Sequence, residues 1–186
     1  MTECITQFLL ENFPDRSELS YEDFTLASVD EPAGFDHAIE CCAYDYDKEL
    51  AERAFRIISR PWPEIDWFQI APGGGMVPMF LNKKSFLHAF PSLLNYLCIL
   101  APPGIGEGGD NLASNFVERL DFNHLAFLEK EIWGEGAFNW IREFYFSLSG
   151  DVKKMIYKIL VLSEQKERTG YAEDALASYW VQFAGD

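Results

Sequence analysis

The sequence is poor in basic residues. It contains 15 Lys and Arg against 30 Asp and Glu among 186 residues, which leaves a formal net charge of −15 at pH 7. Nucleic acids and anionic membrane surfaces both bind proteins through basic patches. The charge therefore argues against a nucleic-acid partner and against attachment to an anionic membrane.

Long apolar runs are also missing. No window reaches the roughly 18 consecutive apolar residues that a membrane-spanning helix requires. The first residues, MTECITQFLLENFP, carry acidic side chains where a secretory signal peptide would carry Lys or Arg. We therefore expect a cytoplasmic protein without membrane insertion.

Motifs for metal binding and nucleophilic catalysis are lacking as well. The four cysteines form no CxxC pair, and Cys41 and Cys42 adjoin acidic residues that disfavour a reactive thiolate. His37, His88 and His124 are widely spaced and match no metal-ligand motif. The sequence therefore predicts no catalytic residue and no bound metal.

Two glycine runs match phosphate-binding loops only in part. Gly104, Gly106 and Gly109 fit GxGxxG, but two prolines separate them from an apolar run that favours a helix over a strand. The glycines at residues 73–75 lack the Lys-Ser/Thr pair of a phosphate loop. Both runs are more typical of turns, so we expect no nucleotide and no other cofactor.

Apolar and aromatic side chains are abundant. Hydrophobic residues make up 48% of the chain and aromatic residues 16%, which is unlike the composition of disordered chains. A chain of this length can bury a substantial core within one domain. We predict a single globular domain over residues 1–186, with residues 60–100 as its core-forming stretch.

Helical spacing of apolar residues recurs along most of the chain. The clearest case is residues 151–168, where Val152, Ile156 and Ile159 share one stripe and Gly170 supplies a stop. The predicted fold class is therefore mainly α, a compact multi-helix domain. Helices are expected over residues 2–13, 37–59, 83–100, 111–120, 123–133, 137–148, 151–168 and 171–183.

The core-forming stretch combines several local patterns. Pro61 and Pro63 oppose a helix, so Trp62 and Trp67 are expected on an extended segment. A glycine-rich turn between short apolar segments leaves room for one small β-hairpin near residues 66–81. The following helix is expected to kink or restart at Pro91.

The acidic residues are concentrated in the first third of the chain. Residues 1–50 hold 13 Asp and Glu but only Arg16 and Lys48, a net charge of −11. Repulsion within such a segment costs stability, whereas a basic partner would be attracted and selected by it. A surface that only maintains solubility is the alternative explanation.

Part of the chain resembles a known group of proteins. Residues 62–100, above all FLNKKSFLHAFPSLLNYL, together with ALASYW at residues 175–180, resemble an uncharacterised bacterial family of small acidic proteins. In size, acidity and absence of a catalytic signature, the chain is also similar to the immunity proteins that protect bacteria from the toxins of competitors. The second likeness implies a binding function and carries over no functional residue.

We therefore predict a cytoplasmic immunity protein that binds a cognate antibacterial toxin with a basic surface. Binding would occlude the active or substrate-binding surface of the toxin. The contact is expected in the first third, where carboxylates supply charge and aromatic rings supply anchors. The predicted contact residues are Glu18, Tyr21, Glu22, Asp23, Phe24, Asp30, Glu31, Asp36, Tyr44, Asp45 and Asp47.

Two other functions stay open. A small enzyme or ligand-binding domain would have an aromatic pocket lined by Trp62, Trp67, Phe68 and His88. A structural subunit of a larger complex would expose part of its aromatic surplus as an apolar patch.

Overall fold

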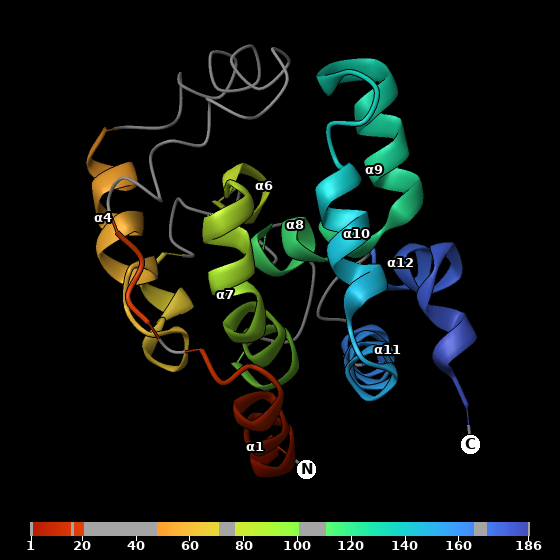
Figure 1. Cartoon of the computed structure of the whole chain (residues 1–186), viewed down its shortest axis with the longest axis horizontal. Coiled ribbons are helices and arrows are strands. Elements are labelled where there is room, and N and C mark those ends of the chain that lie inside the picture. Colours follow the sequence, from red (N-terminus) through yellow and green to blue (C-terminus); the bar gives the residue numbers. More distant parts are fainter. Residues whose placement is uncertain are drawn as a thin grey trace.

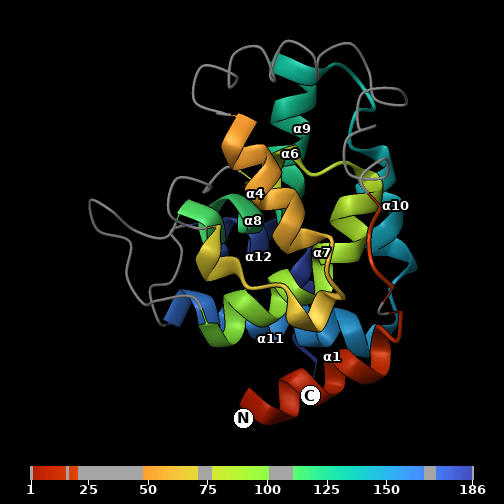
Figure 2. The same ribbon diagram turned by 90° about the vertical axis from the view of Figure 1, so that its left-hand side faces the viewer.

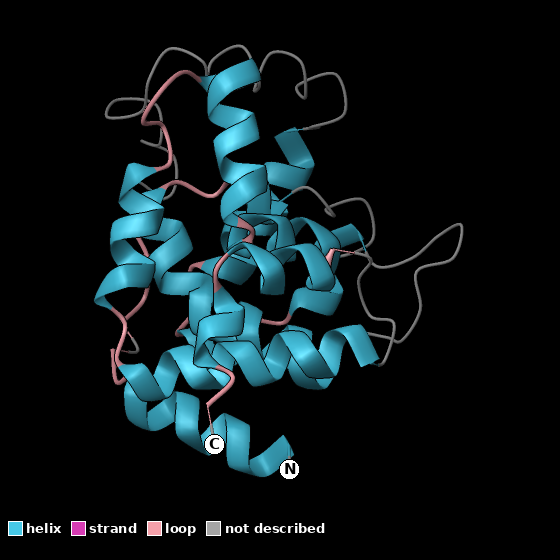
Figure 3. Ribbon diagram, turned by 90° about the vertical axis from the view of Figure 1, so that its right-hand side faces the viewer, coloured by secondary structure: helices cyan, strands magenta, loops and turns pink. Residues whose placement is uncertain are grey.

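The computed structural model describes residues 2–15, 17–20, 48–70, 77–100, 111–165 and 171–185. These residues form helices joined by short connections (Figure 1), and no β-strand is present among them, as Figure 3 shows. The predicted fold class, a mainly α compact multi-helix arrangement, is confirmed. Over the same ranges, no helix is both long enough and apolar enough to span a membrane.

The helical elements follow the expected order along the chain. The helix expected over residues 37–59 is described from Lys48 onward, and residues 37–47 lie outside the described ranges. The elements are α1 (Thr2–Asn12), α4 (Lys48–Ile58), the 3-10 turns η2 (Trp62–Glu64) and η3 (Trp67–Gln69), α6 (Val77–Phe80), α7 (Lys83–Asn95), the π-helix η4 (Tyr96–Leu100), α8 (Asn111–Leu120), α9 (Phe122–Leu128), the π-helix η5 (Glu129–Trp133), α10 (Asn139–Ser147), α11 (Gly150–Gln165), α12 (Ala172–Ser178) and the 3-10 turn η6 (Trp180–Phe183).

Helix α7 runs through the middle of the molecule, between α4 on one side and α8 and α10 on the other (Figures 1 and 2). Phe86, Phe90 and Leu93 are fully buried there. Their helical spacing places them on one face, as expected for a helix that packs against several others. Pro91 lies inside α7 and does not end it. The helical geometry changes only at Tyr96, where η4 begins.

The hairpin expected near residues 66–81 is not confirmed. On one side of the expected turn, the Asp66 carboxylate accepts hydrogen bonds from Phe68 N at 3.1 Å and Gln69 Nε2 at 2.8 Å, which stabilises the 3-10 turn η3. On the other side, Pro78 is the second residue of α6, where its missing N–H needs no partner within the helix. Both expected strands are helical turns, and residues 71–76 lie outside the described ranges.

Trp62 and Trp67 were expected on an extended segment, and this expectation is wrong. Each begins a 3-10 turn, η2 or η3, and each is buried. A buried indole N–H requires an acceptor. Trp62 Nε1 donates to Phe13 O at 3.0 Å and Trp67 Nε1 donates to Ser92 Oγ at 3.0 Å. Both residues therefore connect segments that are far apart in the sequence.

A buried cation lies in the core between α7, α8 and α10. The Arg119 side chain is 2% exposed, and its guanidinium carbon is 5.1 Å from the centre of the Phe86 ring. Its Nη1 donates to Leu81 O at 3.2 Å, and the Tyr145 hydroxyl donates to Arg119 O at 3.0 Å. Burial raises the pKa of Tyr145 far above its usual range, so the phenol stays neutral and can donate.

A turn and an ion pair join η5 to α10. Gly134 and Gly136 have positive φ of 89° and 84°, a conformation that favours glycine. Across this turn, Glu129 accepts from Arg142 Nη1 at 2.8 Å and Nη2 at 2.7 Å, and from Phe138 N at 2.8 Å. Burial alone would raise the pKa of Glu129, but the hydrogen bonds from Arg142 and Phe138 outweigh it and lower that pKa.

Candidate functional site

Among the predicted contact residues, Glu18 alone lies within the described ranges. Its side chain is exposed on the connection that follows α1. The other ten lie outside the described residues, so their contact role stays a prediction: Tyr21, Glu22, Asp23, Phe24, Asp30, Glu31, Asp36, Tyr44, Asp45 and Asp47.

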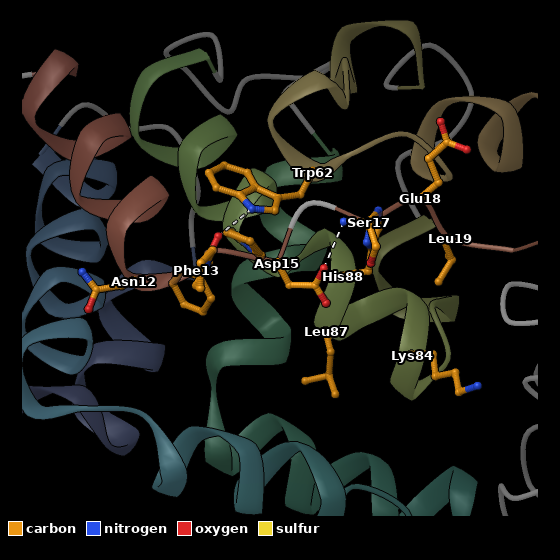
Figure 4. Close-up of a pocket in the computed structure, with 12 residues that line it drawn as sticks. Asn12, Phe13, Asp15, Ser17, Glu18, Leu19, Trp62, Lys84, Leu87 and His88 are labelled. Carbon is orange, nitrogen blue, oxygen red and sulfur yellow. Dashed lines mark hydrogen bonds between the residues drawn. The ribbon is translucent and has the colours of Figure 1, made fainter.

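Glu18 borders a surface pocket of about 450 Å³ (Figure 4). Small-molecule sites commonly enclose about 300–1,000 Å³, so the pocket is large enough for a ligand or for a side chain of a partner. One wall is the connection after α1, and the other is one face of α7, with η2 between them. The lining residues are Asn12, Phe13, Pro14, Asp15, Ser17, Glu18, Leu19, Trp62, Lys84, Leu87, His88 and Pro91.

The apolar part of the pocket is fixed by contacts with the core. The bond from Trp62 Nε1 to Phe13 O holds the start of the connection, and the Phe13 ring packs edge-on to Phe90 with centroids 5.9 Å apart. Further along, Leu19 N donates to Ser59 O at 2.9 Å. Residues 13–15 and 17–20 are not helical, and these contacts help to hold them opposite α7.

The polar part of the pocket contains Asp15 and His88. Ser17 N donates to Asp15 Oδ1 at 3.0 Å, and hydrogen bonds from the amide and hydroxyl of Ser17 lower the pKa of Asp15, with a smaller contribution from His88. Asp15 is therefore a carboxylate at neutral pH. His88 Nε2 lies 2.8 Å from Arg60 O, and because a carbonyl only accepts, Nε2 carries the hydrogen. In the neutral ring, Nδ1 is then an acceptor.

Two exposed charges, Glu18 and Lys84, lie at the rim of the pocket. Figure 4 shows the Lys84 ammonium pointing away from Asp15, at the end of the pocket remote from Asn12. The carboxylate of Asp15 and the imidazole of His88 are thus two polar groups of the pocket that hydrogen bonds hold in place, and the carboxylate presents acceptors.

The aromatic pocket suggested by the sequence is found in part. Trp62 and His88 line the observed pocket. Trp67 is instead fully buried and bonded to Ser92. Phe68 is 47% exposed and packs edge-on to Tyr96, with ring centroids 5.4 Å apart, and it does not line the pocket.

Of the wall that α7 contributes, the sequence predicted His88 but not Lys84, Leu87 or Pro91, although a signal is present. Lys84, Leu87, His88 and Pro91 recur at spacings of three and four residues, so they share one face of a helix. The opposite wall could not be found in this way, because residues 12–19 show no periodicity.

A second pair of ionisable residues lies where α8 meets α9. His124 Nε2 is 3.7 Å from Glu118 Oε2. Burial raises the pKa of Glu118, His124 opposes this, and Asp121 adds to it. Asp121 itself caps α9 by accepting from Asn123 N at 2.8 Å. Neither these three residues nor any other group of three or more His, Cys, Asp or Glu in the described ranges is placed to hold a metal ion.

Near the C-terminus, four rings form a surface group that we call the C-terminal aromatic cluster: Phe122, Phe146, Tyr179 and Phe183. Phe122 and Tyr179 stack with centroids 4.3 Å apart, and Phe146 is 55% exposed. Lys153 Nζ lies 5.6 Å from the centre of the Phe183 ring. Phe122, Tyr179 and Phe183 are half-buried and pack against the core, so Phe146 is the one exposed ring of the cluster.

Comparison of the chain with protein-family models, with curated proteins and with solved structures finds no match. Its function must therefore be inferred from the charge distribution, the pocket and the exposed side chains.

Proposed function

We propose that this chain is a binding protein that neutralises a basic toxin by covering the toxin's active or substrate-binding surface. The observation that carries the proposal is the acidity of the first 50 positions, which hold 13 acidic residues and only two basic ones. Charge of one sign gathered in one segment attracts a partner of opposite charge and disfavours wrong partners. Small size, acidity and the absence of a catalytic sequence signature support the class of immunity proteins.

The contacts on either side of residues 21–47, which we call the acidic stretch, support its role as a surface presented to a partner. Before it, Trp62 and Ser59 hold the chain through hydrogen bonds to Phe13 O and from Leu19 N. After it, the chain enters α4 at Lys48. Ser59 directly follows Ile58 of α4, so the bond from Leu19 ties the first flank to the C-terminal end of the helix that the chain enters at Lys48. Anchored flanks lower the conformational entropy that binding has to overcome.

The proposal is tested by reversing the same number of acidic residues in two different regions and comparing the effect on partner binding. One variant reverses Glu22, Asp23, Asp30 and Glu31 to Lys. The control reverses four exposed acids of the last third, Glu143, Glu164, Glu173 and Asp174, and therefore has the same net charge. Both are used to capture partners from the native host, and the captured protein is then expressed alone or with each variant in an indicator strain.

We expect the natural chain to capture a basic protein that arrests growth of the indicator strain and to relieve that arrest. The first variant should bind it at least about tenfold more weakly and fail to protect, because it repels the basic surface. The control should protect. Equal loss in both variants, or equal binding by both, contradicts the proposed contact, and capture of no toxic protein contradicts the proposed function.

A ligand-binding or enzymatic domain is the second candidate, and the pocket lined by Trp62 and His88 is the observation that favours it. A metabolite that saturates the pocket without affecting capture of the toxin would support this candidate. Thermal shift with a metabolite collection, repeated on His88→Ala, measures this directly.

A further inference from the structure

We propose that the pocket between residues 12–19 and α7 receives an arginine side chain of the basic partner. The inference rests on the proposed function, because it names the group by which that partner would be held. Every residue that lines the pocket is described, and the lining ends at Leu19, shortly before the acidic stretch.

The first argument is the identity of the fixed polar atoms. Ser17 positions the Asp15 carboxylate, and the lowered pKa of Asp15 keeps it ionised at neutral pH. Arg60 O holds the hydrogen on Nε2 of His88, which leaves Nδ1 of the neutral ring as an acceptor. The ionised carboxylate of Asp15, together with Nδ1 of His88 where the ring is neutral, favours a ligand rich in donors. A guanidinium has five N–H donors and no acceptor.

The second argument is the apolar surface below these acceptors. Phe13, Trp62, Leu87 and Pro91 supply it, and Trp62 is held in place by its bond to Phe13 O. The three methylenes of an arginine can lie along such a surface while the charged end stays near the polar rim. An anion fits less well, because it would face the Asp15 carboxylate. A purely apolar ligand would leave that carboxylate desolvated without a partner.

The third argument favours a partner side chain over a free amine. Glu18, at the rim, belongs to the first 50 residues, whose net charge is −11, so the pocket opens beside the region expected to attract a basic protein. Arginine is enriched among the few side chains that dominate protein interfaces. A planar guanidinium can also pair with a carboxylate through two parallel hydrogen bonds, which fixes the orientation of the partner.

The test titrates the full chain with N-acetyl-arginine methylamide and follows Trp62 Nε1–H and the His88 ring by NMR. N-acetyl-citrulline methylamide is the matched neutral probe, because it has the same shape without the charge. We expect saturable shifts confined to the pocket, and binding of the arginine probe at least about fivefold tighter than that of citrulline. Equal binding of both probes, or no saturable shift, overturns the proposal.

Variants of the pocket sharpen the test. Asp15→Asn removes the charge and should weaken arginine binding about threefold, in the range of an exposed ion pair. Leu87→Gln should weaken both probes by removing the apolar wall. Glu143→Gln, an exposed change on α10, should alter neither. Arginine binding unchanged in Asp15→Asn, or weakened equally in Glu143→Gln, contradicts the site.

The source of the cation is decided with two further probes and with the toxin. Tighter binding of N-acetyl-lysine methylamide overturns the choice of arginine, and tighter binding of free putrescine overturns the partner side chain. If the arginine probe fails while charge reversal of the acidic stretch still abolishes capture of the toxin, this inference alone is wrong. If the probe binds but the chain captures no toxin, the proposed function fails and with it the assignment to a partner.

Discussion

Two regions of this molecule place a charged side chain beside aromatic rings, and they differ in how much water reaches the charge. Arg119 is 2% exposed, donates to Leu81 O and lies over the Phe86 ring. Asp15 is exposed, bonded to Ser17 and open to a pocket of about 450 Å³. A charge enclosed by the core stabilises one arrangement of helices, whereas a charge at an open rim is available to a partner.

The same contrast holds for two tryptophans. Trp180 is fully buried and its Nε1 donates to Leu120 O at 2.8 Å, which ties the end of the chain to α8. Trp62 makes an equivalent bond to Phe13 O, but there it holds the start of the connection after α1 at the pocket. The same kind of indole hydrogen bond therefore stabilises the core in one region and the wall of a candidate site in the other.

The largest expected effect comes from removing the enclosed charge. Arg119→Ala leaves a cavity between α7 and α8, and it removes the donor to Leu81 O and the contact with Phe86. We expect a loss of about 3 kcal/mol in the free energy of unfolding, measured by urea denaturation. Lys154→Ala, exposed on α11, should change it by less than about 0.5 kcal/mol. Equal effects of the two would mean that Arg119 is not a structural charge.

The next effect concerns the ion pair of Glu129 with Arg142. Glu129→Gln should lower the free energy of unfolding by about 2 kcal/mol at pH 7, because a partly buried, charge-assisted pair is lost. The exposed pair of Glu131 with Lys130 is the matched control, and Glu131→Gln should cost less than about 0.5 kcal/mol.

This pair also makes a pH prediction. The pKa of Glu129 in the folded chain is lowered from 4.5, so its contribution is present above that value and disappears as the pH falls through the lower folded pKa. The difference between the natural chain and Glu129→Gln should therefore shrink in acid. A difference that stays constant from pH 7 to acid would show that the carboxylate charge is not involved.

A smaller effect on stability is expected for two tryptophan variants, and it distinguishes the pocket from the core directly. Trp62→Phe and Trp67→Phe each keep a ring and lose one indole hydrogen bond, so each should cost about 1 kcal/mol. Only Trp62→Phe should weaken binding of the arginine probe, since only that bond holds the wall of the pocket. Urea denaturation and NMR titration measure the two quantities, and equal loss of probe binding in both variants would remove the distinction.

The smallest expected effect on stability is that of Asp15→Asn. The side chain is exposed, so the urea midpoint should not change measurably, while binding of the arginine probe should fall. A clear loss of stability would place Asp15 with Arg119, among the charges that hold the fold.

Much of the fold could be predicted from local pattern. The stripe of Val152, Ile156 and Ile159 predicts α11, and the spacing of Phe86, Phe90 and Leu93 predicts α7, because one face of each helix is buried. The hairpin was predicted from the glycine run and the short apolar segments beside it, and the capping role of Asp66 was not considered. An Asp side chain that accepts from an amide two residues later favours a turn over a strand.

Only part of the candidate site could be predicted. Glu18 was named for its charge, and Trp62 and His88 for their chemistry, and all three line the pocket. The wall formed by the connection after α1 depends on a bond between Trp62 and Phe13, which are 49 positions apart. No periodicity of residues 12–19 reports such a contact.

The sequence by itself therefore determined the helical class and the concentration of acid in the first third, because periodicity and composition are local properties of the chain. Tertiary structure decided which charges are enclosed and which are open. In the sequence, Arg119 and Asp15 each adjoin an oppositely charged residue, Glu118 or Arg16, so the local pattern does not distinguish them. Packing of α7, α8 and α10 removed water from Arg119, whereas the connection after α1 left Asp15 in contact with solvent, and burial of this kind arises only when distant segments meet.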